Sequence, residues 1–202
     1  MLRASLTMIC TATLLAVASV APATTALGAP AAAAVPHYTL DPAKSSLEFA
    51  FTQAGALNKG HFVRFPVSLD FAADNLAASR LEVGVEVTSL DTGDKDRDDT
   101  LRGADLFAVA KFPQAHFSAA QIVKTAAGYE AAGKLTIRGV TRDARVPFTF
   151  RTASEQGTTV GYMSGKVTIR RLDFGVGQGD WKATDQVGND VVVSFALRLT
   201  GH

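Results

Sequence analysis

The sequence predicts an all-β fold, an eight-stranded antiparallel barrel with a short helical insertion, and three observations support this prediction. From about Tyr38 onward, apolar residues recur at every second position in about eight runs, which is the periodicity of strands with one buried face. Turn residues separate most neighbouring runs, and the connections are too short for parallel crossovers. Eight strands close into a barrel just wide enough to be filled by side chains or to hold one small ligand. A sandwich of two sheets is the competing arrangement.

Three strands are expected before the insertion, at about residues 46–51, 65–71 and 81–87. Each alternates large apolar side chains with polar or small ones, which gives the strand one face for the interior. The apolar members are Leu47, Phe49, Phe51, Phe65, Val67, Leu69, Phe71, Leu81, Val83, Val85 and Val87. A fourth strand is expected at 117–123, where the alternation is less regular.

The long connection of residues 91–114 precedes this fourth strand and holds the predicted helix. A short helix is expected from about Asp98 to Val109. It should end before Pro113, because the residue before a proline is disfavoured in helical conformation. The helical insertion therefore lies between strand 4 and the preceding strand.

Four more strands complete the predicted barrel, at about residues 129–137, 146–150, 161–169 and 191–199. The clearest turns lie at Gly128, Gly139 and residues 155–157. Within 133–150, the apolar face carries Leu135, Ile137, Val146, Phe148 and Phe150. The charged residues Arg138, Arg142, Asp143 and Arg145 are expected in the turn or on the opposite face.

Residues 1–23 are expected to be a secretory signal peptide. Arg3 gives a basic start, an apolar run follows, and a group of small residues ends at Ala23, which is the pattern of a cleaved signal. An uncleaved membrane anchor is the alternative, although the run is short for a membrane span. Residues 24–36, rich in Ala, Pro and Thr, are expected to form a flexible leader before a barrel domain at 37–202. The expected location is the periplasm or the cell exterior.

The charge balance disfavours a nucleic-acid-binding protein. The chain of 202 residues has a formal net charge of +1, and removal of Arg3 leaves basic and acidic residues equal in number, at 19 each. A neutral domain has no electrostatic footprint for phosphate backbones or anionic lipid surfaces. The single cysteine, Cys10, lies in the signal segment, so no internal disulfide is expected.

Candidate metal-binding and catalytic patterns fail on their spacing. Asp94, Asp96 and Asp98 resemble the start of a calcium loop, but Asp99 replaces the glycine of the sixth position and Asp105 the glutamate of the twelfth. No pair of histidines has the close spacing of a zinc site. The serine of GYMSG lies one place too late for a nucleophile elbow, and no helix pattern follows GVGQG. We therefore expect no metal, no cofactor and no catalysis.

The remaining signal is apolar, and it leaves a filled core and a ligand cavity both open. Twelve phenylalanines and Trp181 lie mostly on strand parities or beside glycine-rich turns. Ala131, Gly133, Gly161 and Gly165 place small residues on the apolar parity. Such residues either leave volume for a ligand or mark bends in barrel strands.

Six segments resemble, in the same order, the YceI-like family of exported lipid-binding proteins. They are YTLDPAKSSLEFAF at 38–51, the Gly60-His61-Phe62 turn, residues 88–119, GKLTIRGVTRDARVPF from 133, RRLDFGVG at 170–177 and VVVSFALRL at 191–199. Lys44 stands where the family often has His, and Arg170 where Asn is common. The segment GQGDWKATDQVGND is similar to a branch found near or fused to cytochrome b561 membrane domains.

The resemblance implies a lipocalin-like barrel whose long apolar pore holds a polyisoprenoid chain, such as a polyprenyl lipid or the tail of a quinone. It implies a binding protein and not an enzyme, since a hydrolase or isomerase acting on an isoprenoid would require a polar cluster inside the barrel. The alternative is a ligand-free partner protein of a cytochrome b561-type membrane redox complex. The oligomeric state stays open, with a dimer as one option.

Strand parity supplies the candidate lining residues, although it does not separate residues that touch a ligand from those that only pack. The candidates are Phe49, Phe51, Val67, Leu69, Val83, Val85, Phe117, Leu135, Ile137, Phe148, Phe150, Val167, Ile169 and Phe195. Phe174 and Trp181 are candidates for the mouth of the pore. Arg97 and Asp98 are expected to hold the insertion loop.

Overall fold

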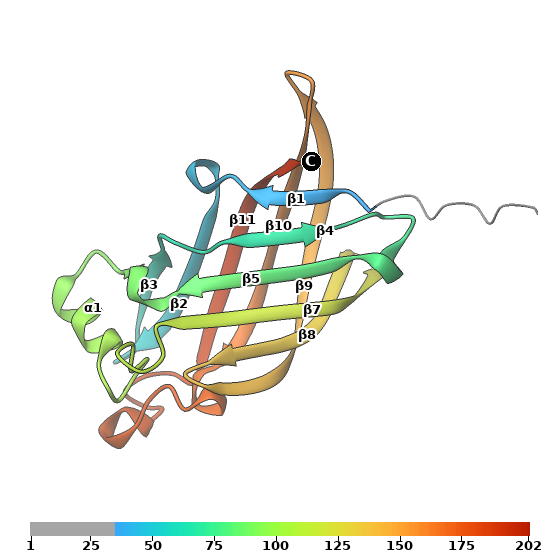
Figure 1. Ribbon diagram of the computed structural model, residues 1–202. Helices are drawn as coiled ribbons and strands as arrows, with labels where there is room; N and C mark the ends of the chain where they lie inside the picture. The colour runs from blue at the N-terminus through green and yellow to red at the C-terminus, as the bar shows by residue number, and fades with distance from the viewer. Residues whose placement is uncertain (1–34) are drawn as a thin grey trace, which may run out of the picture. The chain divides into compact units, whose positions relative to one another are not determined.

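The computed structural model describes residues 35–202 (Figure 1). The predicted signal peptide and most of the predicted leader lie outside the described residues. The strands are β1 His37–Leu40, β2 Ser46–Gln53, β3 Ala56–Phe62, β4 Val67–Asp70, β5 Arg80–Glu86, β6 Leu90–Asp91, β7 Gln114–Thr125, β8 Gly128–Ile137, β9 Val140–Glu155, β10 Thr158–Arg170 and β11 Asp190–Gly201. The helix α1 spans Lys95–Arg102, and short 3-10 turns occupy η1 Pro42–Lys44, η2 Leu76–Ala78, η3 Val87–Ser89, η4 Arg171–Phe174 and η5 Gly179–Lys182. None of the described helices is both long and apolar enough to span a membrane.

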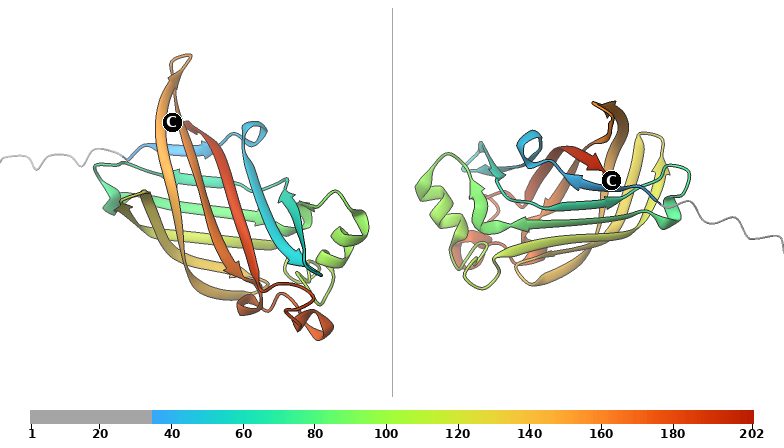
Figure 2. Two further views of the ribbon diagram at one scale, coloured as in Figure 1. Left: turned by 180° about the vertical axis from the view of Figure 1, so that it is seen from behind. Right: turned by 45° about the horizontal axis from the view of Figure 1, so that its top comes forward.

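Eight of the strands close into a ring in the order β1-β4-β5-β7-β8-β9-β10-β11, and β11 pairs back with β1. All neighbouring pairs in this ring are antiparallel. The predicted eight-stranded barrel is therefore confirmed, and the sandwich is excluded. The strands β2, β3 and β6 extend the wall at the end of the barrel that carries α1 (Figure 2).

The structure has three strands that the sequence did not predict, β1, β3 and β6, and 3-10 turns separate two of them from the strands that were predicted. The turn η1 separates β1 from β2. The C-terminal end of β11 therefore pairs with β1, and the N-terminal part of β11 pairs with β2. The turn η3 separates β5 from β6 in the same way. The helical insertion lies between β6 and β7, which is the position that the sequence predicts.

Two-residue turns with positive φ at both positions join the long hairpins, as the right-handed twist of antiparallel strands requires. Arg138-Gly139 and Gln156-Gly157 form two of them, which confirms the turns predicted there. A third turn of this kind, Ala54-Gly55, joins β2 to β3 and was not predicted. The expected turn at Gly60-His61-Phe62 is consequently wrong, because these residues lie in β3 and pair with β2 and β6.

The helix begins earlier and ends earlier than predicted. Its N-cap is Asp94, whose side chain accepts a hydrogen bond from the backbone N–H of Arg97 at 3.0 Å, and Gly103 is its C-cap. Asp98 is buried, and its carboxylate accepts from the backbone N–H and the hydroxyl of Thr92 at 2.9 and 2.7 Å. These carboxylates therefore hold the insertion together, which is the role expected for Asp98.

The irregular alternation of the fourth predicted strand has a structural cause. The register between β7 and β8 shifts between Ser118 and Gln121, which is a β-bulge. Phe117 is buried before the bulge and Ile122 after it, so the parity that faces the interior changes along the strand. The bulge also brings the Ser118 carbonyl within 2.1 Å of where a Cβ on Gly133 would stand. Gly133 thus permits a close backbone approach and adds no cavity volume.

Candidate ligand-binding site

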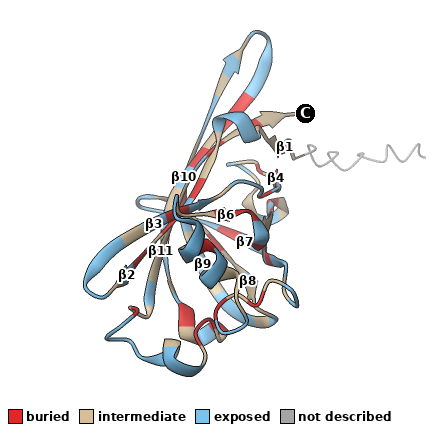
Figure 3. Ribbon diagram, turned by 90° about the vertical axis from the view of Figure 1, so that its left-hand side faces the viewer, coloured by how far each residue is buried: buried red, intermediate tan, exposed pale blue. Residues whose placement is uncertain are grey.

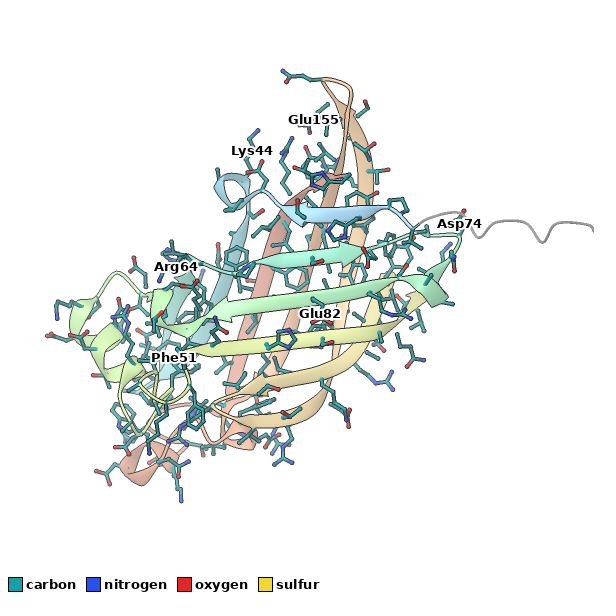
Figure 4. All side chains as sticks on the ribbon, in the orientation of Figure 1. Lys44, Phe51, Arg64, Asp74, Glu82 and Glu155 are labelled. Carbon is teal, nitrogen blue, oxygen red and sulfur yellow. The ribbon has the colours of Figure 1, made fainter. Side chains whose placement is uncertain are left out.

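Aromatic rings fill one end of the barrel, and we call this cluster the aromatic plug. It consists of Tyr38, Phe71, Tyr129, Phe148 and Phe150. The ring centroids of Phe71 lie 4.6 Å from Phe150 and 4.9 Å from Tyr129, which are normal packing distances for aromatic pairs. The plug lies at the end opposite α1. Figure 4 shows Phe51 near α1 and Glu155 on the hairpin that projects beyond the other end.

A cavity of about 880 Å³ occupies the barrel between the plug and α1. Its volume lies in the range of roughly 300–1,000 Å³ that is typical of ligand sites. The wall is formed mainly by aliphatic and aromatic side chains. The predicted residues that border it are Phe49, Phe51, Val67, Val83, Val85, Phe117, Leu135, Ile137, Val167, Ile169, Phe174, Trp181 and Phe195.

The predicted residues Leu69, Phe148 and Phe150 do not border the cavity. Leu69 is completely buried in the packed core, and Phe148 and Phe150 belong to the aromatic plug. Their side chains point inward as parity predicts, but they lie too close to the plugged end. Parity identifies the inner face of a strand, whereas depth along the barrel decides whether that face meets packing atoms or empty volume.

Several cavity residues were missed by the sequence analysis. Phe62 was assigned to a turn, and the side chains of the insertion and of the η4–η5 loop carry no strand period. The missed apolar wall residues include Phe62, Leu101, Leu106, Phe107, Met163, Val176, Val187 and Val193. The alternation of β10 and β11 would have found Met163 and Val193, but no periodicity could have found those in the loops.

The end of the cavity near α1 is covered by a small apolar cluster. Leu106, Phe174 and Val176 are buried there, and the half-buried Trp181 packs against them. Figure 3 views the barrel from the side of α1, half of whose residues are exposed. Phe174 and Trp181, the candidates for the mouth of the pore, therefore belong to the cluster that covers this end.

Arg171 anchors the loop that carries Phe174 and Trp181. Its side chain is 4% exposed, and its guanidinium donates to the backbone carbonyls of Val176, Val187 and Gly188 at 2.7–2.9 Å. Burial lowers the pKa of this guanidinium. Within residues 35–202 no carboxylate forms an ion pair with it, so carbonyl dipoles alone compensate the charge. The loop is consequently folded around a buried cation.

The barrel wall has a seam between β9 and β10. Their pairing runs from the hairpin turn down to Phe148 and Gly165 and then stops, although β9 begins at Val140 and β10 continues to Arg170. Consecutive residues of both strands, 142–146 and 167–170, border the cavity. Only alternate residues of a closed wall face inward, so the cavity opens sideways through the seam.

The position of Arg142 differs from the one expected from the sequence. It was placed on the face opposite to the apolar side chains, but the register pairs it with Leu135 and puts it on the inward parity. The two-residue turn at Arg138-Gly139 sets this register. Arg142 nevertheless remains exposed, because the wall beside it is open. Arg138 lies in the turn as expected, and Asp143 and Arg145 are on the outward parity.

Comparison with known proteins agrees with this architecture. A family model described as the YceI-like domain matches residues 38–199. The crystal structure of BcnA from Burkholderia cenocepacia superposes with a TM-score of 0.72 at 31% identity, covering 79% of this chain and 98% of that one. A polyisoprenoid binding domain from Saccharophagus degradans shares the fold, with a TM-score of 0.61 at 18% identity over 82% of this chain and 98% of that one. A UPF0312 protein of Yersinia pestis is 41% identical over 83 residues, which are 41% of this chain and only 43% of that relative.

Proposed function

The chain belongs to the YceI-like family, and we propose that it is an exported binding protein that holds a polyisoprenoid, or the isoprenoid tail of a quinone, in its barrel. The observation that carries this proposal is the cavity of about 880 Å³ with its largely apolar wall. The Saccharophagus neighbour, named as polyisoprenoid-binding, motivates the ligand class. The barrel binds and shields its ligand and catalyses no reaction on it.

Burial of hydrocarbon is sufficient to explain binding. Each CH₂ group that leaves water contributes about 0.8 kcal/mol, so a long chain gains affinity along its whole length with few polar contacts. The plug gives the cavity a closed apolar end. The isoprenoid chain therefore enters away from the plug, with its apolar tip pointing toward the plug.

The alternative is a ligand-free partner of a cytochrome b561-type membrane complex. That role requires no interior volume, and a filled barrel would serve it equally well. The cavity favours the carrier function. A partnership with a redox complex stays a prediction from the sequence.

Export to the periplasm or the cell exterior is part of the proposal and rests on residues 1–23. The N-terminal sequence of the protein recovered from its own cells tests it. A new N-terminus after the apolar run, at Ala23 or within the following Ala-rich stretch, is expected. A chain that keeps Met1 and the apolar run would contradict cleavage.

Lipid extraction tests the binding function. Protein purified from its own cells is extracted with organic solvent, and the extract is examined by mass spectrometry for an isoprenoid at near-stoichiometric amount. Val193→Asp places a charge on the cavity wall and should abolish retention. Val123→Asp, on a side chain 39% exposed on the outside, is the matched control. Circular dichroism excludes misfolding, and lipid-free wild-type protein in repeated preparations would overturn the proposal.

A further inference from the structure

The seam between β9 and β10 carries an excess of unpaired positive charge. Two acid–base pairs at its edge are satisfied: Asp143 lies 2.7 Å from the Lys134 ammonium, which lowers the pKa of Asp143, and Arg145 lies 2.8 Å from Glu130. Both pairs join β9 to β8. The unpaired positive charge of the seam therefore comes from other residues.

Three cations at the seam lack a close carboxylate. Arg142 donates from Nε to the backbone carbonyl of Asp173 at 3.2 Å, and within residues 35–202 its guanidinium forms no ion pair. Lys166 is exposed on β10 and likewise forms no ion pair within that range. Arg170 lies 3.8 Å from the carboxylate of Asp173, a distance too long for a hydrogen bond. None of these three cations is therefore neutralised by a hydrogen-bonded carboxylate within residues 35–202, although Asp190 on β11 is the register partner of Arg170.

The other polar part of the cavity wall lies near α1 and is balanced in charge. At α1 the wall contains Asp94, Asp96 and Arg97, and Arg97 lies 3.5 Å from the Asp94 carboxylate. Arg171, in the loop that covers this end, also borders the cavity, so two acids and two bases balance there. An anionic group at the cavity is therefore attracted more to the seam than to this end.

We infer that the seam binds an anionic head group, a phosphate or a carboxylate, carried by the same molecule whose apolar chain fills the cavity. The inference rests on the proposed carrier function and specifies its ligand class. Arg142 and Arg170 stand on opposite edges of the seam, and guanidinium groups bind oxyanions through paired N–H donors. Thr168, which also borders the cavity, supplies a hydroxyl on the β10 edge of the seam, two residues before Arg170.

The position of the seam suits an amphiphile. A charged head group is too costly to bury in an apolar interior, so it must remain where the cavity meets water. Ala144, Val146, Val167 and Ile169 continue the apolar wall up to that boundary. The chain can therefore lie inside the barrel while the head group stays at the rim, hydrated and paired with arginine.

Matched ligands test the inference. Geranylgeranyl monophosphate, geranylgeraniol and inorganic phosphate are titrated into delipidated protein, with the fluorescence of Trp181, the only tryptophan of the chain, as the signal. The phosphate-bearing lipid should bind roughly ten- to hundredfold more tightly than the alcohol at low salt. The advantage should shrink as salt increases. Inorganic phosphate should bind far more weakly than either lipid, because it has no chain for the cavity.

The double variant Arg142→Gln/Arg170→Gln should lose this advantage and retain its affinity for geranylgeraniol. Arg151→Gln is the matched control, because Arg151 is an exposed arginine of β9 in the sealed half of the wall. Equal binding of the two lipids by the wild type, or equal weakening in the control, would overturn the head-group inference and leave the carrier function intact. Binding of neither lipid would overturn both.

A second measurement tests the seam without changing its charge. Cys10 is the only cysteine and lies in the predicted signal segment, so Thr168→Cys gives the mature protein a single thiol at the rim. Labelling it with a bulky maleimide should slow uptake of the phosphate-bearing lipid at least tenfold. The same label on Thr149→Cys, outward on β9 above the seam, should have little effect. Equal uptake rates for the two labelled proteins would contradict binding through the seam.

Discussion

Two leucines distinguish a barrel with an open cavity from a barrel that is filled throughout. Leu69 is completely buried in the packed core, whereas Leu135 is half-buried and borders the cavity. Both point inward, and both are changed to alanine. The stability of the delipidated variants is then compared with that of the wild type by urea unfolding.

The expected magnitudes follow from what surrounds each side chain. Truncation of leucine to alanine removes about three carbon groups, which contribute about 2.4 kcal/mol when fully buried. Around Leu69 the neighbours already touch, so the new void adds a further penalty and the total loss should reach about 3–5 kcal/mol. Leu135 keeps part of its exposure and already faces empty volume, so its truncation adds little new void and Leu135→Ala should cost about 1.5–2 kcal/mol.

The difference in lost stability between Leu69→Ala and Leu135→Ala decides whether the cavity is present. Leu57→Ala, at a side chain that is 67% exposed, controls for the substitution itself and should cost less than about 0.5 kcal/mol. A loss at Leu135 as large as the loss at Leu69, with unchanged m-values, would show that Leu135 is tightly packed in solution. The cavity would then be absent, and the carrier function would lose its main support.

Two further predictions concern the loop around the buried arginine and the projecting hairpin. Gly177→Ala should destabilise the protein by more than about 2 kcal/mol, because φ is +112° and the new Cβ would lie 1.9 Å from Arg171 Nη1. Gly179→Ala, where φ is +54° and no atom lies within 4 Å of the new Cβ, is the control and should cost about 1 kcal/mol. Equal urea midpoints for the two variants would contradict the close contact between Gly177 and Arg171. Glu155 accepts hydrogen bonds from the hydroxyl of Tyr162 and from Arg198, and these bonds lower its pKa. Its stabilisation is therefore complete above the unfolded pKa of about 4.3 and disappears as the pH falls through the lower folded value, so wild type and Glu155→Gln should differ in urea midpoint at pH 7 and converge in strong acid. A difference that persists at the acid limit would refute this assignment.

Strand period predicted the barrel because each wall strand must present one apolar face to the interior. It predicted the turns at Gly139 and Gly157, where a positive φ favours glycine. It did not predict the turn at Ala54-Gly55, because the residues on both sides of Gly55 are also small and no apolar alternation marks where the strands end and begin. The helix was displaced for a different reason. Leu106 borders the cavity and Val109 packs against a core cluster, and the spacing of these two apolar residues resembles that of a helical face.

The cavity was harder to predict than the wall. An inward phenylalanine has the same sequence pattern in the plug as beside the ligand volume, and Phe148 and Phe195 illustrate the two cases. Small inward residues were equally ambiguous. Gly165 suggested empty space, but a Cβ there would lie 2.5 Å from the ring of Phe195, so the aromatic ring occupies that volume. Only the depth of each residue along the barrel resolves these cases, and depth depends on register.

The seam, by contrast, has a signature in the sequence. Pro147 immediately precedes the last residue of β9 that pairs with β10, and proline has no N–H to extend a ladder. Five residues earlier, the inward parity that carries Val146 and Phe148 places a charged side chain at Arg142. A guanidinium on the inner face of a closed apolar wall would be buried without a partner, at a cost of several kcal/mol. A proline where the pairing ends, followed by an arginine on the inward parity, therefore indicates that the strand has lost its neighbour. In this barrel, Arg142 lies where the interior meets water.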